Sequence, residues 1–489
     1  MLDQEKKSEI DAAVLSAVEV FRGYCEPIES VGFTLALLLL KFLSDVLFEN
    51  TGEGRKAIED PYLLVPEESD FYRLLNNARE PDIGWRLNRA MQALQNANLQ
   101  MNDVFWGINF DAIAVSSKTP KDRVLGNFFD AFRSPALEFR GDRDLAQEVA
   151  AYACDAVITY ASSSSGKRGG EFFTAPQISK LMARVMRPVE GDRISDPFCG
   201  VAATLIACRE YALKTHGEWG GGLYGQDANG SVLALARMSM ILHGETQFQL
   251  EWGDTLRDPK LLDCYHLKKF EIVVSHPPFS LRDWGFEHAE RDAYHRFRRG
   301  VPPRALGDYA CISHMVETLA AGVGRMAVLV PLGVLFRGAS EQQIRKQLIE
   351  ENLVDAVIGL PPKLLSHTPI AMAILVLRRN KSSEDVLFID ASRDFQPGKV
   401  CNVLRDFDLD KIEQTYTSRQ SVARYAMCAS LKEIEANDYT LNIARYIDLS
   451  EDEVQVDLSA LRIERARLKT EFEVLEAKLT MLCEGLRDG

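Results

Sequence analysis

The sequence predicts an α/β fold with a doubly wound parallel sheet, flanked by an N-terminal helical domain and a C-terminal helical segment. Between residues 171 and about 395, short apolar runs alternate with helical patterns, which is typical of a sheet covered by helices on both faces. Before residue 160 the apolar residues recur at helical spacing, and beyond residue 400 the chain turns charged and helical. We therefore expect three domains, at residues 1–160, 161–400 and 401–489.

The N-terminal domain is predicted from two apolar helical patterns. Ile10, Val14, Val18 and Phe21 recur at helical spacing, and residues 33–48 form a second, more apolar pattern. Lys41 interrupts that second pattern, and no run of about 18 apolar residues occurs, so we expect no membrane span. The charged N-terminus has no apolar stretch after it, which argues against a secretory signal. The polar segment 161–170 is expected to be a linker or a mobile loop.

The central domain is predicted strand by strand. Strands are expected at 192–196, 222–226, 271–275, 325–331, 354–359, 371–378 and 385–389. Helices are expected between them, among others at 176–187, 228–243, 310–320 and 340–351. This alternation is the pattern of βαβ units in a parallel sheet.

The C-terminal segment carries a heptad pattern. Its first series is Leu461, Leu468, Leu475 and Leu482, and its second is Phe472, Leu479 and Leu486. Steps of four and three between the two series form an apolar seam of coiled-coil type. Two interpretations are open: a helix that packs on its own domain, or an interaction helix for another subunit.

Composition limits the function classes. The net charge is −14, whereas a protein that binds DNA without a partner usually presents a basic surface. If DNA is the substrate, we therefore expect a partner protein to recognise its sequence. The nine cysteines are scattered without a CxxC pair. We therefore expect reduced thiols in a cytoplasmic protein, with no disulfide frame and no metal site.

Two of the predicted strand ends, and a third strand end just before residue 253 that is not among the strands named above, carry the pattern of a cofactor site. The first ends in Asp196-Pro197-Phe198-Cys199-Gly200, the second in Asp227, and a third turn carries Asp254-Thr255. Ligands of open α/β sheets bind at the carboxyl ends of strands, where an acid can accept from ribose hydroxyls. A single strand-end aspartate is more often a helix cap or a solvated side chain, but the ordered series points to a cofactor pocket.

A fourth strand end carries the turn His276-Pro277-Pro278-Phe279. The two prolines hold an extended turn and remove two amide donors, so carbonyl groups there can accept from a ligand. An aromatic ring follows immediately. This arrangement suits a planar base with an exocyclic amine.

Longer segments carry a resemblance to a known family. Gly170-Glu171-Phe172-Phe173-Thr174-Ala175-Pro176, the stretches 225–229 and 235–244, the stretches 325–338 and 357–362, and residues 437–446 are similar to the modification (M) subunit of type I restriction-modification systems. The His276–Phe279 turn resembles the Asn-Pro-Pro-Phe motif of adenine-N6 DNA methyltransferases, with histidine in place of asparagine.

The resemblance implies a Rossmann-like methyltransferase domain and a specific activity. The family transfers methyl from S-adenosylmethionine to a flipped adenine in double-stranded DNA, at sites that a DNA-specificity (S) subunit chooses. It implies a complex that also holds a second copy of the chain and a restriction/translocase (R) subunit. The expected cofactor residues are Glu171, Phe172, Phe173, Thr174, Asp196, Pro197, Cys199, Gly200, Asp227, Asp254 and Thr255, and the expected catalytic residues are His276, Pro277, Pro278 and Phe279.

Two departures from the family support a second hypothesis. His276 replaces an amide acceptor; a neutral imidazole can also accept, through Nδ1 at a roughly similar distance from the backbone, whereas a protonated one only donates. After Gly200, the residues Val201, Ala202 and Ala203 stand where the family has small, glycine-rich residues, and their methyl groups would narrow the cofactor pocket. The alternative is therefore a weak or inactive scaffold of the same fold that binds DNA and partner subunits.

Two basic stretches have open interpretations. The locally basic segment Lys118–Arg123 is expected to be a solvated loop rather than a binding surface. Residues 291–304, which follow the Pro-Pro-Phe turn, hold five arginines and His295 and are expected either to contact DNA phosphates or to form a solvated loop.

Overall fold

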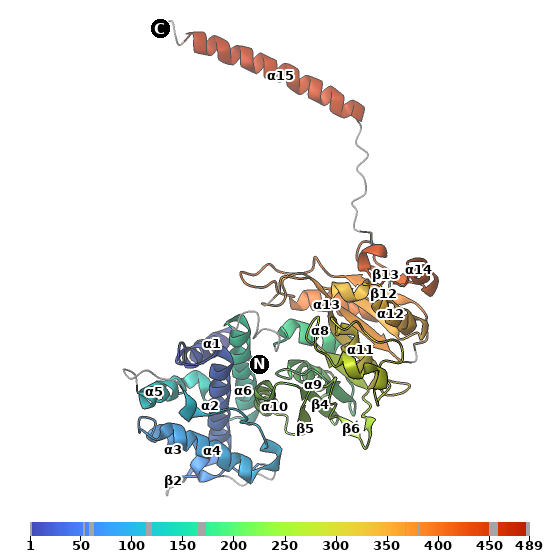
Figure 1. Ribbon diagram of the computed structural model, residues 1–489. Helices are drawn as coiled ribbons and strands as arrows, with labels where there is room; N and C mark the ends of the chain where they lie inside the picture. Colours follow the sequence, from blue (N-terminus) through green and yellow to red (C-terminus); the bar gives the residue numbers. More distant parts are fainter. Residues whose placement is uncertain are drawn as a thin grey trace. The chain divides into compact units, whose positions relative to one another are not determined.

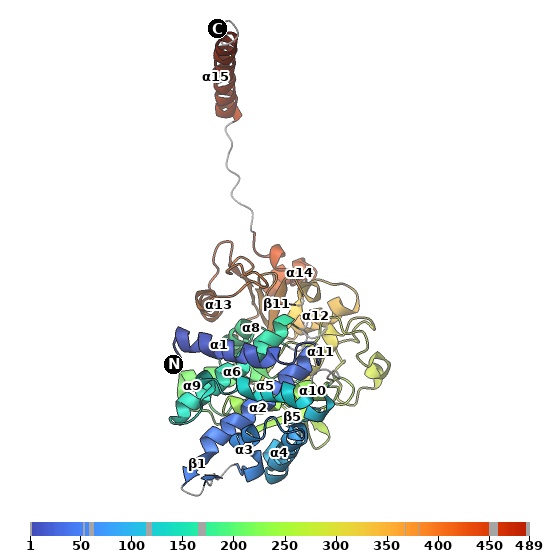
Figure 2. The ribbon, with the colours of Figure 1, turned by 90° about the vertical axis from the view of Figure 1, so that its left-hand side faces the viewer.

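The computed structural model describes residues 2–51, 54–57, 63–113, 120–164, 173–366, 368–379, 381–448 and 458–485. The chain forms two compact units, Met1–Ile447 and Asp448–Gly489. The first unit holds the helical N-terminal region and the sheet, and the second holds one long helix (Figures 1 and 2).

The N-terminal region is helical, as predicted. Its helices are α1 (Gln4–Glu19), α2 (Pro27–Leu47), α3 (Phe71–Asn76), α4 (Ile83–Ala97), α5 (Lys121–Ala131) and α6 (Arg143–Ser164), with a short hairpin of β1 (Phe48–Thr51) and β2 (Gly54–Ala57). Short 3₁₀ turns lie at Glu67–Ser69, Leu99–Met101, Phe110–Ala112 and Pro135–Leu137. Residues 161–164, expected in a linker, are instead the last residues of α6; the remainder of the predicted linker, 165–170, lies outside the described residues.

Helix α2 is the centre of the N-terminal core. It is long and apolar enough to cross a membrane by length and composition, yet 94% of its most apolar window is buried inside the protein. A helix that is apolar all round must be covered on all sides. Its one buried cation, Lys41, lies 2.7 Å from the carboxylate of Asp45, and the Tyr72 hydroxyl donates to the same carboxylate at 2.7 Å.

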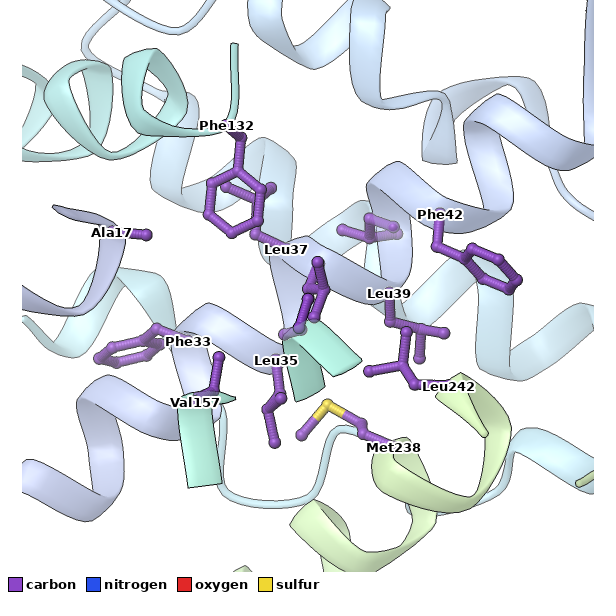
Figure 3. Close-up of a cluster of buried hydrophobic side chains, with 14 of the residues drawn as sticks. Ala17, Phe33, Leu35, Leu37, Leu39, Phe42, Phe132, Val157, Met238 and Leu242 are labelled. Atoms are coloured by element: carbon purple, nitrogen blue, oxygen red, sulfur yellow. The ribbon is translucent and has the colours of Figure 1, made fainter. Parts of the chain in front are cut away.

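The same core joins the helical region to the sheet domain. In Figure 3, Leu35 and Leu39 of α2 lie beside Met238 and Leu242 of α10, and Val157 of α6 lies on the other side. Helix α10 (Gly230–Leu242) belongs to the sheet domain, because it follows the second strand of the parallel sheet. The helical region is therefore packed on the sheet domain through a continuous apolar interior.

A nine-stranded sheet forms the second part of this unit, in the order β13-β12-β10-β11-β9-β8-β3-β4-β5. Its strands are β3 (Arg193–Asp196), β4 (Gly222–Asp227), β5 (Phe248–Trp252), β8 (Ile272–Ser275), β9 (Arg325–Pro331), β10 (Val354–Gly359), β11 (Met372–Arg378), β12 (Val386–Asp390) and β13 (Ala426–Ala429). Strands β5, β4, β3, β8 and β9 are parallel, whereas β11 runs antiparallel between β9 and β10. The predicted doubly wound α/β sheet is confirmed.

The helices of the sheet domain lie between these strands in the chain. They are α8 (Pro176–Met186), α9 (Ala203–His216), α10, α11 (Asp308–Glu317), α12 (Ser340–Glu350), α13 (Asp406–Ser418) and α14 (Leu431–Ala436). A two-stranded piece, β6 (Leu262–Asp263) with β7 (His266–Leu267), and 3₁₀ turns at Phe286–Arg291, Leu332–Leu335 and Ile443–Arg445 complete it. Beyond residue 400 the chain was expected to be helical, but β13 adds an edge strand to the sheet, antiparallel to β12.

Local sequence explains the two helices that border the site. Pro176 occupies the first turn of α8, where its missing amide costs no hydrogen bond. Asn229 caps α10, because its side-chain oxygen accepts from the amides of Ser231 and Val232. Helix α10 begins directly after the carboxyl end of β4, which ends at Asp227.

The second unit is α15 (Leu458–Gly485). Its predicted seam residues Leu461, Leu468, Phe472, Leu475 and Leu479 are all more than half exposed. Among the residues described in this unit, the seam has no intramolecular cover. The side chain of Leu482 and all of Leu486 lie outside the described residues.

Candidate functional site

One cavity of about 490 Å³ opens at the carboxyl edge of the sheet. Its walls are residues 198–200 after β3, 227–230 after β4, 254–255 after β5, the turn after β8, and Thr174 ahead of α8. The chain runs outward from β3 through β4 to β5 and then returns to place β8 on the other side of β3. The cavity therefore lies at the point where the strand order reverses, which is where open α/β sheets bind ligands.

Asp227 is held through both of its carboxylate oxygens. Its Oδ2 accepts from the amide of Gly200 at 3.0 Å and its Oδ1 from the amide of Asn229 at 2.8 Å. Burial raises the pKa of Asp227 above its ordinary value, while these two amides oppose that shift. The acid thus links the turn after β3 to the turn after β4.

Asp196 lies beneath the cavity and does not line it. Its Oδ1 accepts from the Ser275 hydroxyl at 2.6 Å and from the Phe198 amide at 3.0 Å. Burial raises the pKa of Asp196 to about 7. Because Ser275 precedes His276 and Phe198 precedes Cys199, Asp196 ties the two sides of the site together.

The residues after Gly200 lie beside the cavity, and Val201 and Ala203 line a smaller neighbouring cavity of about 60 Å³ that shares Thr174 with it. Val201, Ala202 and Ala203 are absent from the described lining of the larger cavity. Val201 is buried in the core shared with the N-terminal helices, and Ala202 is buried in the sheet core. Gly200 and Ala202 both adopt positive φ, at 53° and 65°. This backbone conformation favours glycine, so the alanine at position 202 is strained.

The turn after β5, which carries Asp254 and Thr255, is held by hydrogen bonds to nearby backbone groups. Asp254 lines the cavity and accepts from the amides of Leu256 and Arg257 at 2.9 and 3.1 Å. Thr255 also lines it, and its hydroxyl donates to the carbonyl of Pro197, which itself does not face the cavity. Cys199 lines the cavity, and burial raises the pKa of its thiol well above the ordinary value.

The turn after β8 forms the opposite wall. His276 is only 7% exposed and lines the cavity together with Pro278. Its Nδ1 lies 3.1 Å from the Thr174 hydroxyl, and its ring centroid lies 5.1 Å from that of Phe279. Phe279 is half-buried against the sheet core and is absent from the described lining of the cavity.

Of the four predicted cofactor residues in the segment before α8, the structure places one in the cavity lining. Glu171 and Phe172 lie outside the described residues. Phe173 is 3% exposed and belongs to the core of the helical region. Thr174 faces the cavity.

Two arginines of the 291–304 stretch are structural, so the prediction that they contact phosphate is wrong for them. Arg296 is buried and donates to Asp292 and to the carbonyl of Leu256. Arg299 is buried between Glu317 and Glu351, at 2.6 Å from each. The other basic stretch begins α5, with Lys121 donating to Asp111, and Lys118 lies outside the described residues.

The charge of the cavity is acidic. Asp227, Asp254 and Asp283 line it, and its described lining holds no lysine or arginine. Arg257, from outside the lining, pairs with Asp283 and lies 3.8 Å from Asp254. Asp227 is therefore the carboxylate best placed to meet a cationic ligand.

Several lining residues were not predicted: Phe198, Ala228, Asn229, Gly230, Leu281 and Asp283. Asn229 had a usable signal, because an asparagine two residues after a strand-end acid predicts a helix cap beside that acid. Gly230 had none. A side chain there would meet the indole of Trp106 at 2.9 Å, a contact that only the packing of the helical region creates.

Comparisons with known proteins agree with this geometry. Residues 147–455 match the family N-6 DNA Methylase, and residues 10–132 match the HsdM N-terminal domain. The type I restriction enzyme MpnII methylase subunit of Mycoplasma pneumoniae is 32% identical over 346 residues, which cover 68% of this chain and 61% of that protein. The HindI methylase subunit of Haemophilus influenzae is 29% identical, over 75% of this chain and 83% of the relative.

A solved structure extends the similarity to the fold. The type I restriction-modification system methyltransferase subunit from Streptococcus thermophilus superposes with a TM-score of 0.78 at 25% identity, covering 90% of this chain and all of that one. The chain spans less than two thirds of the length of the first three curated relatives. The family match covers more than half of this chain, with the cavity inside it, and the chain therefore belongs to the N-6 DNA methylase family.

Proposed function

We propose that this chain is the methyltransferase subunit of a type I restriction-modification complex, acting on the N6 amine of adenine in DNA with S-adenosylmethionine as methyl donor. One observation carries the proposal: Asp227 and His276, at the ends of β4 and β8, line the same cavity at the switch point of the sheet. Family membership and the similarity to type I methylase subunits support it.

The residues of the cavity fit S-adenosylmethionine. A volume of about 490 Å³ is in the range of small-molecule and cofactor sites. Asp227 would hold the ribose hydroxyls, and the turn at Gly200 allows the backbone to approach closely. The acidic lining suits a cationic ligand. When bound there, this cofactor supplies an electrophilic methyl group at its sulfonium.

The turn after β8 would hold the target base. An amine inside a stacked duplex is out of reach, so the adenine must leave the helix to enter the cavity. The carbonyl of Pro277 and the imidazole of His276 would accept hydrogen bonds from the amine and direct its lone pair. Much of the rate then comes from placement of the amine. Stacking of Phe279 on the base requires its ring to turn from His276 toward the cavity.

The structure also supports the partner proposal. The net charge of −14 and the burial of Arg296 and Arg299 leave DNA recognition largely to other subunits. The seam of α15, which no described residue of its own unit covers, suits a helix of a specificity subunit, because apolar side chains at a and d spacing pack into a second helix. Double-stranded DNA, a second copy of the chain and a restriction subunit complete the proposed complex, which would act in the cytoplasm.

The alternative function is a scaffold of the same fold that transfers no methyl group. It is favoured by His276, which stands where the family has an amide acceptor. The substitutions at 201–203 favour it less, because those side chains are absent from the described lining of the larger cavity, although Val201 and Ala203 line the smaller one beside it.

Two measurements separate the two functions. The purified chain is titrated with S-adenosylmethionine by calorimetry, and the chain assembled with its specificity subunit is assayed for methyl transfer to DNA. Saturable binding together with transfer supports the enzyme. Binding without transfer, restored by His276→Asn, shows that histidine disables the site. No binding by the folded chain contradicts the cofactor assignment.

A further inference from the structure

Two tryptophans contact the turn that follows β4. Trp252 ends β5 and Trp106 belongs to the helical region, yet their ring centroids lie 5.2 Å apart, with the ring planes tilted by 45°. A Cβ atom at Gly230, which lines the cavity, would lie 2.9 Å from Trp106 and 3.2 Å from Trp252. Both indoles therefore lie against a residue of the cavity wall, although neither is in the described lining.

Trp252 holds this turn by a hydrogen bond. The parallel ladder of β4 and β5 pairs Trp252 with Asp227, and the indole Nε1 of Trp252 donates to the carbonyl of Ala228 at 3.1 Å. The amide of Asn229, the next residue, donates to the carboxylate of Asp227 at 2.8 Å. The turn is therefore fixed at two consecutive residues, through a carbonyl at 228 and an amide at 229.

The segment that carries Trp106 is anchored on the same part of the sheet domain. Arg237 of α10 donates to the carbonyl of Asp103 at 3.4 Å and to the carbonyl of Leu250 at 2.8 Å. Leu250 belongs to β5 and precedes Trp252 by two residues. One side chain thus ties the segment of the helical region to the strand that ends in Trp252.

The exposure of the two indoles argues against a role in core packing alone. Trp252 is 54% exposed and Trp106 is 47% exposed, whereas the large side chains of the core are almost completely buried. An indole combines a flat apolar ring with one N–H donor, so it can cover a turn and fix a carbonyl at the same time. The contact with Gly230 and the hydrogen bond to Ala228 are the two interactions of this kind here.

We propose that Trp252 is a positioning residue for the cofactor: its hydrogen bond to the Ala228 carbonyl fixes the turn that presents Asp227, and Trp106 keeps its indole in place. The inference rests on the proposed function for the identity of the cofactor, whereas the fixing of the turn is a property of the chain alone. Through Trp106 the helical region takes part in a site that is built mostly by the sheet domain.

Hydrogen exchange of the full chain, followed by mass spectrometry, tests whether the indole fixes the turn. Trp252→Phe keeps an aromatic ring and removes Nε1–H. The amides of residues 228–232 should then exchange about 3–10-fold faster, the effect of losing one hydrogen bond of ordinary strength, while the amides of β9 keep their native rates. Trp85→Phe, at an indole of α4 that is 52% exposed, is the matched control and should change neither region.

Trp106→Leu tests the contribution of the helical region. Loss of the contact between the rings should speed exchange of the same amides about 2–5-fold. In the double variant Trp106→Leu/Trp252→Phe the acceleration should be smaller than the product of the two single effects, because both substitutions act on one hydrogen bond. An acceleration equal to the product would overturn the role given to Trp106.

Calorimetric titration with S-adenosylmethionine tests the consequence for the cofactor. Trp252→Phe should raise the dissociation constant about 3–10-fold, while turnover of the assembled complex at saturating S-adenosylmethionine should change less than about twofold. A merely structural role would lower the unfolding midpoint and leave the affinity of the folded protein unchanged. That result would overturn the inference, as would native exchange rates of the turn in Trp252→Phe.

The two measurements also separate this inference from the proposed function. If the native chain binds S-adenosylmethionine and Trp252→Phe binds it equally well, the inference alone fails. If the native chain does not bind S-adenosylmethionine, the proposed function fails. Faster exchange in Trp252→Phe then still supports the fixing of the turn, and unchanged exchange overturns the inference as well.

Discussion

The two sides of the cavity are built by different means. On the proposed cofactor side, Asp227 accepts hydrogen bonds from the backbone amides of Gly200 and Asn229. On the proposed base side, His276 contacts the side-chain hydroxyl of Thr174 and the ring of Phe279. Where backbone amides orient a functional side chain, neighbouring residues can be substituted without loss of those hydrogen bonds. Where another side chain orients it, a substitution of either partner changes the hydrogen bonds of the site.

The same difference separates the two departures that the sequence analysis singled out. Val201 and Ala202, on the proposed cofactor side, are buried and absent from the described lining of the cavity. The replacement on the base side, His276, brings a new hydrogen-bond partner into the site. The comparison makes four predictions, from the largest effect to the smallest.

The largest effect is expected at His276. If His276 acts on the amine in the transition state, as proposed, His276→Ala should lower turnover in the assembled complex about 10²–10³-fold. Binding of S-adenosylmethionine by calorimetry should change less than about threefold, since the residues proposed to hold the cofactor lie on the other wall. His276→Asn is the matched control, because it restores an acceptor. A loss of turnover below about threefold in His276→Ala would show that the imidazole takes no part.

A smaller effect is expected on the cofactor side. Asp227→Asn keeps the shape of the side chain but loses the charge and one acceptor, so the dissociation constant for S-adenosylmethionine should rise about 10–100-fold, equivalent to about 1.4–3 kcal/mol. Asp254→Asn is the control, because the nearby Arg257 already compensates its carboxylate, and its effect should be smaller. If the two variants bind equally, the special role of Asp227 is contradicted.

The pH dependence of stability should report Asp196, which links the two walls. Its pKa is raised by burial to about 7, from an ordinary value of 3.8. The folded state therefore holds a proton that the unfolded state has released, so this contribution to stability is complete below pH 4 and is lost as the pH rises through 7. Between pH 5.5 and 8.5 the loss should be on the order of 2 kcal/mol.

Thermal denaturation of the chain and of Asp196→Asn checks this contribution. The native midpoint should fall more between pH 5.5 and 8.5 than that of the variant, by about 2–4 °C. Parallel curves for the two proteins would show that Asp196 does not titrate in that interval.

The smallest effect is expected at Ala202. Its φ of 65° costs an L-residue about 1 kcal/mol, so Ala202→Gly should stabilise the chain by up to that amount. Ala236→Gly in the middle of α10 is the control, since glycine in a helix interior destabilises by about 1 kcal/mol. Denaturant titration should give opposite signs for the two variants. A destabilised Ala202→Gly would mean that the turn tolerates alanine without strain.

The sequence predicted the sheet domain well because its signals are local. The strands at 325–331 and 354–359 were predicted with their observed bounds, since buried runs flanked by turn residues have few other interpretations. Strand β13 was missed, because Ala426–Ala429 is short, carries little strand propensity and is held by pairing with β12. Its formation depends on the tertiary fold.

The site was predicted only in part, because only some of its features are local in the sequence. Strand-end residues such as Asp227 and His276 are visible in the sequence, and both line the cavity. Whether a side chain lines the cavity or lies beneath it is not local information: Asp196 and Phe279 are absent from the described lining, and Trp106 reaches Gly230 only because α2 and α6 pack on α10. The contact between Thr174 and His276 likewise depends on how two distant segments meet.

One measurement tests the central claim most directly. DNA treated with the chain, its specificity subunit and S-adenosylmethionine is digested to nucleosides and analysed by mass spectrometry. N6-methyldeoxyadenosine should appear with the native chain and fall to background with His276→Ala, while methylated cytosine stays at background in both. Saturable binding of S-adenosylmethionine without N6-methyldeoxyadenosine, from an assembled complex that binds its DNA, would contradict the account.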